Sequence, residues 1–172
     1  MNKKKLNYRV TYLEMNRKPS FDWPKNLKHK LSILLAESFP AWYFLFFYKQ
    51  VGKNYYWTDW LRKSEDEIDE FVNDKNVILY TLIKDGWPVG FYMLDYRKKD
   101  ICDLSFFGLV DEVIGIGLGK YLLQTAILTA WDNKKIKKLT VNTCSLDHKS
   151  AIYLYQKYGF TPVKYKDLEK TV

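Results

Sequence analysis

The stretch from residue 104 to residue 131 constrains the fold more than any other part of the chain. It begins as an apolar strand and passes through a short acidic turn to three closely spaced glycines, Gly115, Gly117 and Gly119. A helix follows, because apolar residues recur there with a helical period. These residues are Leu118, Leu122, Leu123, Ala126, Ile127, Ala130 and Trp131. The pattern predicts a strand, a glycine loop and a helix in direct succession.

A loop of this kind is suited to binding an anion. The first turn of a helix has unpaired N–H donors and the positive end of the helix dipole, and glycines let a phosphate approach closely. Two common phosphate loops do not fit. The dinucleotide pattern G-x-G-x-x-G needs a third glycine where Lys120 stands, and the mononucleotide P-loop fails at Ile114 and Tyr121. A glycine-rich turn without a ligand stays open as an alternative.

Length and composition limit the classes of protein to be considered. The 172 residues, 47% of them hydrophobic, predict one globular domain over 1–172. Cys102 and Cys144 show no metal-type spacing, so we predict no metal site and no disulfide framework. The start Met1-Asn-Lys-Lys-Lys lacks the apolar stretch of a secretory signal, and no apolar run is long enough to span a membrane. We therefore expect a cytoplasmic protein without a membrane partner.

The formal net charge of +8 raises the question of nucleic-acid binding. The lysines are scattered, however, and no RNP, helix-turn-helix or zinc-finger pattern accompanies them. We expect no nucleic-acid partner, and we interpret the charge as a solvated basic surface that also attracts a polyanionic cofactor. An RNA-associated module is kept as a weaker alternative.

The remaining elements predict an α/β (α+β) fold on a mixed sheet. Ser64 and Glu67 form a capping box that opens a helix over 65–72, and Asp85-Gly86 is a tight hairpin turn. Asp147 is the expected N-cap of a helix that runs to Tyr158. The predicted strands are 7–15, 77–83, 89–96, 101–110, 137–144 and 160–165, with a further helix over 27–37.

Ten aromatic residues lie between Trp42 and Trp60. Rings in such number either pack in the core or build the wall of a pocket for an apolar or cationic group. For the second case we name Trp42, Phe46 and Trp57 as candidate substrate-binding residues.

Two motifs together resemble those of the GCN5-related N-acetyltransferase (GNAT) family. Residues 114–119, IGIGLG, match the family's pyrophosphate loop [QR]-x-x-G-x-[GA], except that Ile114 replaces the usual Gln or Arg. In 142–160 the family pattern N-x-x-A-x-x-x-Y-x-x-x-G-F is matched by Ala151, Tyr155, Gly159 and Phe160, with His148 at the Asn position. The resemblance covers residues 77–163 well, whereas 1–75 match only in general character.

The resemblance implies a fold, a cofactor and a reaction. The expected fold has a mixed, mostly antiparallel sheet flanked by helices, in which strand 101–110 splays from strand 137–144. Residues 77–163 would form the acetyl-CoA-binding core, and 1–75 the acceptor side. The implied reaction is direct acetyl transfer from acetyl-CoA to a primary amine, on a small molecule or a peptide, in a ternary complex. Dimers are common in the family, so a homodimer is one expected assembly.

The resemblance also assigns residues to the cofactor. Leu109 and Val110 would bind the pantetheine arm through their backbone, and backbone N–H groups of the loop would bind the pyrophosphate. The loop residues are Gly115, Ile116, Gly117, Leu118, Gly119 and Lys120. His148 would bind the cofactor or accept a proton, since a helix N-terminus favours the neutral imidazole. The alternative for His148 is a spacer that replaces Asn.

Two residues are the catalytic candidates. Tyr155 stands at the position of the tyrosine that protonates the departing thiolate, and a phenol with a pKa of about 10 stays protonated at neutral pH. The alternative for Tyr155 is a core ring. Asp103 lies where relatives often carry a Glu that deprotonates the amine directly or through water, unless it simply faces solvent. Cys144 is interpreted as a small buried hydrophobe. A non-catalytic acyl-CoA-binding domain is the main alternative function, and Ile114 supports it.

Overall fold

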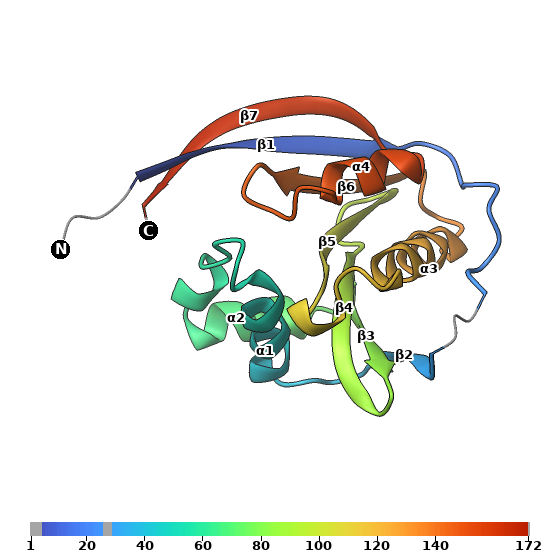
Figure 1. The fold of residues 1–172 in the computed structure, drawn as a ribbon, viewed down its shortest axis with the longest axis horizontal. Helices are drawn as coiled ribbons and strands as arrows, with labels where there is room; N and C mark the ends of the chain where they lie inside the picture. The colour runs from blue at the N-terminus through green and yellow to red at the C-terminus, as the bar shows by residue number, and fades with distance from the viewer. Residues whose placement is uncertain (1–4, 26–28, 172) are drawn as a thin grey trace.

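The computed structural model describes residues 5–25 and 29–171, and one sheet passes through the whole of it (Figure 1). Within these residues the strands run in the order β2-β3-β4-β5-β6-β1-β7. Their bounds are β1 Lys5–Met15, β2 Leu31–Ala36, β3 Val77–Lys84, β4 Trp87–Asp95, β5 Ile101–Leu109, β6 Lys138–Cys144 and β7 Thr161–Thr171. Five neighbouring pairs are antiparallel and only β5 and β6 are parallel, which confirms the predicted mixed, mostly antiparallel sheet.

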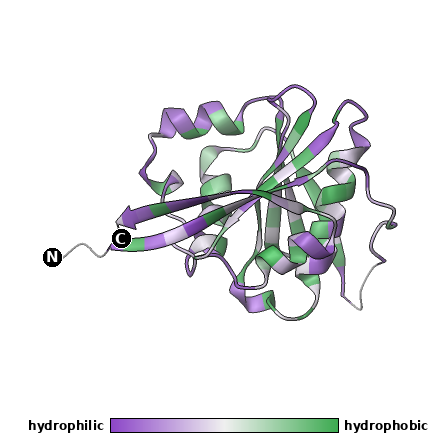
Figure 2. Cartoon of the chain, turned by 90° about the horizontal axis from the view of Figure 1, so that it is seen from above, coloured by the Kyte–Doolittle hydropathy of each residue, from purple (hydrophilic) through white to green (hydrophobic). Residues whose placement is uncertain are grey.

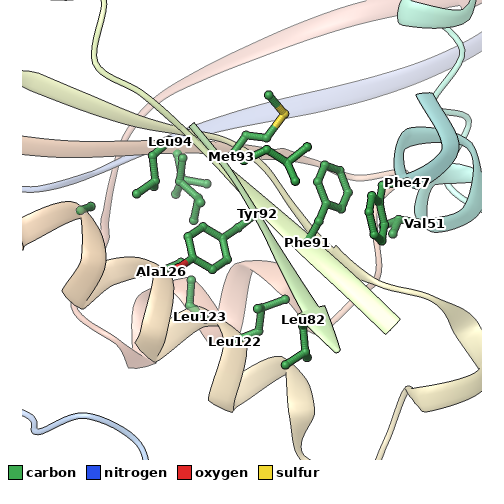
Figure 3. Close-up of a cluster of buried hydrophobic side chains, with 14 of the residues drawn as sticks. Phe47, Val51, Leu82, Phe91, Tyr92, Met93, Leu94, Leu122, Leu123 and Ala126 are labelled. Carbon is green, nitrogen blue, oxygen red and sulfur yellow. The ribbon is translucent and has the colours of Figure 1, made fainter. Parts of the chain in front are cut away.

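Four α-helices cover the sheet, and the central strand β4 is buried between two of them. The helices are α1 Ala41–Gly52, α2 Glu65–Val72, α3 Leu118–Asp132 and α4 Ala151–Lys157, with short 3-10 helices η1 Trp60–Arg62 and η2 Asp111–Val113. Along β4, Phe91 points toward Phe47 of α1, whereas Tyr92 points toward Leu123 of α3 (Figure 3). Alternate side chains of one strand therefore build the core on both faces of the sheet.

Strands β5 and β6 separate shortly after they meet. Their register covers only Ile101–Lys138, Cys102–Leu139 and Asp103–Thr140. On its other side, β5 carries an extra residue, because Leu94 pairs with Leu104 while Met93 pairs with Phe106. Ser105 is thus a β-bulge, and a bulge bends its strand. The opening expected between strands 101–110 and 137–144 is confirmed, and it begins at this bulge.

Residues 31–36 form a strand, which corrects the helix predicted over 27–37. Of that prediction, residues 27–28 lie outside the described residues, and from Leu31 to Ala36 the chain pairs antiparallel with β3. The apolar run Leu-Ser-Ile-Leu-Leu-Ala suits either structure by local pattern. Its antiparallel pairing along the edge of β3 is a non-local contact that the local pattern does not contain.

Helix α4 begins later than predicted, so the assignment of Asp147 as its N-cap is wrong. The helix starts at Ala151 and its N-cap is Ser150. Asp147 instead caps the end of β6, where its Oδ2 accepts hydrogen bonds from the backbone N–H of Cys144 and from Thr143 Oγ1, at 2.8 and 2.9 Å. The capping box of α2 is confirmed, with Ser64 and Glu67 bonded reciprocally.

The first and last described strands form a long ribbon. Strands β1 and β7 pair from Lys5–Thr171 to Glu14–Thr161, whereas β6 pairs only with the half of β1 from Val10 onward. Figure 2 shows this ribbon leaving the body of the molecule, with many polar residues along it. Near its end Lys170 turns back toward the loop after α1, which bears on the site described next.

Candidate active site

The opening between β5 and β6 leads into a cavity of about 360 Å³, a volume within the range of small-molecule sites. Segments from both halves of the chain contribute to its wall: the end of α1 and the loop after it, strand β5, the glycine loop, the end of β6, and α4. The lining residues are Val51, Tyr55, Trp57, Leu104, Ser105, Phe106, Phe107, Gly108, Leu109, Ile114, Gly115, Gly117, Gly119, Lys120, Asn142, Thr143, Asp147, His148, Ser150, Ala151, Leu154 and Tyr155.

The glycine loop has the backbone that an anion site requires. Gly115 and Gly117 have φ angles of 88° and 90°, a left-handed region that favours glycine, and Gly117 is the N-cap of α3. Protein packing does not require glycine at Gly119: a Cβ there would meet only two leucine side chains, at 3.8 and 3.9 Å. Because Gly119 lines the cavity, the free space beside it is available to a ligand.

The other residues assigned to the cofactor divide into two groups. Leu109, Lys120 and His148 line the cavity with the glycines. Val110, Ile116 and Leu118 do not, and the backbone N–H of Val110 bonds to Val89. Leu118 is fully buried in the core, so its side chain is structural. Ile114, the departure from the family loop, lines the cavity and is 39% exposed.

Tyr155 lies in the cavity wall where α4 meets β5. Its ring is 5% exposed and packs edge-on against Phe107 and Phe160, with centroids 6.1 and 5.8 Å away. Burial raises the pKa of Tyr155, and the nearby charge of Asp147 raises it further. The phenol therefore keeps its proton at neutral pH, as a proton donor must. The core environment and the cavity position coexist, so the two sequence interpretations of Tyr155 are compatible.

Asp103 lies outside the cavity lining, at the point where β5 and β6 are still paired. Its carboxylate accepts hydrogen bonds from Thr140 Oγ1, across the parallel pair, and from Ser105 Oγ at 2.8 Å. These contacts explain why a carboxylate is tolerated in a strand that is otherwise apolar. From this position the carboxylate would act on a bound amine only through intervening groups such as water.

Of the three candidate substrate-binding residues, Trp57 alone lines the cavity. Trp42 and Phe46 lie on α1 outside it, 67% and 40% exposed. The loop after α1 also contributes Tyr55, whose ring lies edge-on to that of His148 at 6.3 Å. Most of the other rings in 42–60 belong to the core, where Phe44 and Phe47 are fully buried.

The comparison with protein families gives the same answer as this geometry. Residues 36–160 match the model described as the acetyltransferase (GNAT) family. The chain belongs to the GNAT family. The matched range takes in the glycine loop, Tyr155 and the helix α1 that precedes the aromatic loop.

Solved GNAT structures share the fold. A GCN5-related N-acetyltransferase from Kribbella flavida is 14% identical, with a TM-score of 0.62 over 95% of this chain and 57% of its own. A GNAT family acetyltransferase from Elizabethkingia anophelis, solved with acetyl-CoA bound, is 24% identical, with a TM-score of 0.56 over 78% of each chain. A conserved protein of unknown function from Staphylococcus epidermidis is 14% identical, with a TM-score of 0.68 over 96% of this chain and 62% of its own.

The chain thus spans about three fifths of the Staphylococcus and Kribbella proteins. The comparison with curated protein sequences gives no match. Among the helices of the described residues, none has the length and apolar character needed to cross a membrane.

Sequence reasoning did not assign Asp147 or Tyr55 to the GNAT cavity. Asp147 was interpreted as a helix cap, yet its Oδ1 accepts a hydrogen bond from Trp57 Nε1 at 3.0 Å. That bond joins the end of β6 to the loop after α1, 90 residues away in sequence. The available signal was the pairing of an acid with a histidine at the second motif, but a cap explained the acid equally well.

Lys170 holds the same loop from the opposite end of the chain. Its Nζ donates to the backbone oxygen of Tyr56 at 2.8 Å and to Asp59 Oδ2 at 3.0 Å, and its side chain is only 11% exposed. Tyr56 has a φ of 57°, a strained value for a tyrosine. Strained backbone persists only where its surroundings hold it, and Lys170 is one such contact.

Replacing Lys170 with methionine should therefore loosen the loop that carries Tyr55 and Trp57. We expect faster hydrogen exchange at the amides of these two residues, which both bond to the Gly52 carbonyl. Hydrogen exchange followed by mass spectrometry of the 52–60 segment measures it. Lys166→Met, an exposed lysine on the same strand, is the control and should change nothing there. Unchanged exchange in Lys170→Met would show that the loop is held without this contact.

Proposed function

We propose that the chain is an acetyl-CoA-dependent N-acetyltransferase that transfers the acetyl group directly to a primary amine in a ternary complex. The observation that carries this proposal is that one cavity is lined both by the left-handed glycines and by the protonated phenol of Tyr155. Membership of the GNAT family and the acetyl-CoA bound to the Elizabethkingia relative support the choice of cofactor.

The residues of the cavity fit acetyl-CoA. The loop from Gly115 to Lys120 would hold the pyrophosphate through backbone N–H groups, assisted by the N-terminus of α3 and by the Lys120 charge. Leu109, at the end of β5 and in the lining, would hold the pantetheine arm. Acetyl-CoA, when bound, supplies an activated thioester. Residues 1–75 would supply the acceptor side, through the loop after α1.

Catalysis requires few groups from this chain. Tyr155 keeps a proton on its hydroxyl oxygen for the leaving thiolate, and the buried, ring-lined wall around it limits access of water. Asp103 as the base stays a prediction, and its position requires proton transfer through water. Binding both reactants side by side supplies the remaining advantage, because a bimolecular step becomes effectively unimolecular.

Calorimetry with purified protein tests the cofactor assignment. We expect coenzyme A to bind, with a dissociation constant of about 1 μM to 1 mM as for typical enzyme substrates. Gly117→Val should lower that affinity at least tenfold, because a β-branched residue at a φ of 90° distorts the loop that holds the phosphates.

Gly86→Val is the matched control for this experiment. Gly86 has a φ of 91° in the β3–β4 turn, so valine meets the same backbone strain there, but the turn lies outside the cavity. Coenzyme A affinity should survive in Gly86→Val. Equal affinity in both variants, or none in the wild type, would remove the cofactor assignment.

The alternative is a GNAT domain that binds acyl-CoA without catalysis, and the exposed Ile114 is its support. Release of free coenzyme A thiol, measured with a panel of primary amines, separates the two. Amine-dependent release supports the enzyme, whereas binding without release supports the alternative.

A further inference from the structure

Asp147 is a carboxylate in the cavity wall without a positively charged partner. It accepts three hydrogen bonds, from Trp57 Nε1, Thr143 Oγ1 and the backbone N–H of Cys144, and all three donors are neutral. Neutral donors stabilise the ionised carboxylate but do not cancel its charge. Within the described residues no Lys, Arg or His forms an ion pair with it. Asp147 therefore brings a net negative charge to the cavity.

Other acids beside the site differ in this respect. Asp111 lies 3.2 Å from Lys53 Nζ, and Glu112 lies 3.9 Å from the same group. Neither of them lines the cavity. Among the described lining residues, Lys120 and Asp147 carry the formal charges. Lys120 belongs to the glycine loop, where an anion is expected, so Asp147 is left to face a group of the opposite sign.

Aromatic rings surround that carboxylate. Trp57 is bonded to it, and Tyr55 lines the same cavity from the neighbouring turn of the loop. Burial and the Asp147 charge together raise the pKa of Tyr155 and of Cys144, so the negative field extends along the wall. A carboxylate beside ring faces is the combination that recognises an organic cation, through an ion pair and cation–π contacts.

We propose that Asp147, with the rings of Tyr55 and Trp57, forms a subsite for the ammonium form of the acceptor. The acceptor class is then an aliphatic amine that is cationic at neutral pH, rather than an arylamine or another weakly basic amine. The identification of this cation as the acceptor rests on the proposed N-acetyltransferase function. The binding preference itself does not, and it can be measured without any turnover.

Choline and its neutral isostere 3,3-dimethyl-1-butanol test the subsite, because the two differ in charge and hardly in shape. Binding of each to the coenzyme A-saturated protein is measured by NMR titration. We expect choline to bind about tenfold more tightly, which corresponds to about 1.4 kcal/mol. Equal binding of the two probes, or no detectable binding of choline, overturns the proposal whatever the result with coenzyme A.

Variants locate the preference. Asp147→Asn should bring the ratio of the two affinities to about one, while Glu112→Gln, which removes a charge outside the lining, should leave the preference intact. Trp57→Phe removes the Nε1 bond to Asp147 but keeps the carboxylate, and a choline preference should remain. A preference that persists in Asp147→Asn contradicts the assignment, and the wild-type ratio decides the matter if that variant does not fold.

Discussion

Replacing Tyr155 with phenylalanine should lower amine-dependent thiol release by about 100-fold to 10,000-fold, the usual range for removal of a general acid. The ring would remain packed against Phe107 and Phe160, so the wall of the cavity should keep its shape. Only the proton that the raised pKa of Tyr155 keeps on the phenol would be lost. Coenzyme A affinity, measured by calorimetry, should stay nearly unchanged.

Tyr158→Phe is the matched control for that experiment. Tyr158 follows α4, is 8% exposed and packs edge-on against Phe21, but it does not line the cavity. We expect its turnover to equal that of the wild type. An unchanged rate in Tyr155→Phe would exclude this phenol from the mechanism and leave it as a core ring, and an equal loss in both variants would indicate a general packing effect.

Replacing Phe44 with alanine should lower the free energy of unfolding by about 3–5 kcal/mol, the range for truncation of a buried phenylalanine. Phe44 is fully buried, and its ring lies within 5.1–6.0 Å, between centroids, of four other rings. These belong to Tyr48, Trp60, Phe71 and Phe106. The cluster joins α1, η1 and α2 to strand β5, so its loss should also disturb the cavity wall at Phe106.

Urea denaturation of the wild type and the variant measures this change, provided that the slope of the transition stays the same. Phe46→Ala on the same helix is the control. Phe46 is 40% exposed, so its truncation removes much less buried area and should cost below about 1 kcal/mol. Similar losses in the two variants would show that the ring cluster does not stabilise α1 in the way described.

Local signals made part of this architecture predictable. The glycine loop and α3 carry their pattern in consecutive residues, from Gly115 to Trp131, and the structure confirms both loop and helix. The hairpin at Asp85-Gly86 and the capping box at Ser64 depend on residues at most three positions apart. Tyr155 reached the candidate site only through a family motif, because its own spacing within α4 describes a core ring.

Other features depend on contacts between distant parts of the chain. Helix α1 was not predicted, because rings occupy nearly every position from Trp42 to Tyr48 and leave no apolar period. The strand at Leu31–Ala36 pairs with β3 across an intervening pair of helices. The position of Asp147 in the cavity follows from its bond to Trp57, and no local pattern contains that bond.

The bulge at Ser105 makes the cavity a matter of residue count rather than of residue type. Substitutions at Ser105 keep the chain length that lets β5 turn away from β6. Deleting that one residue would still leave Leu104 opposite Leu94 and Phe106 opposite Met93, so both faces of the sheet would retain their side chains. The shortened strand could then continue its ladder with β6 past Asp103. A single codon deletion could in this way seal the binding cleft of a protein that still folds.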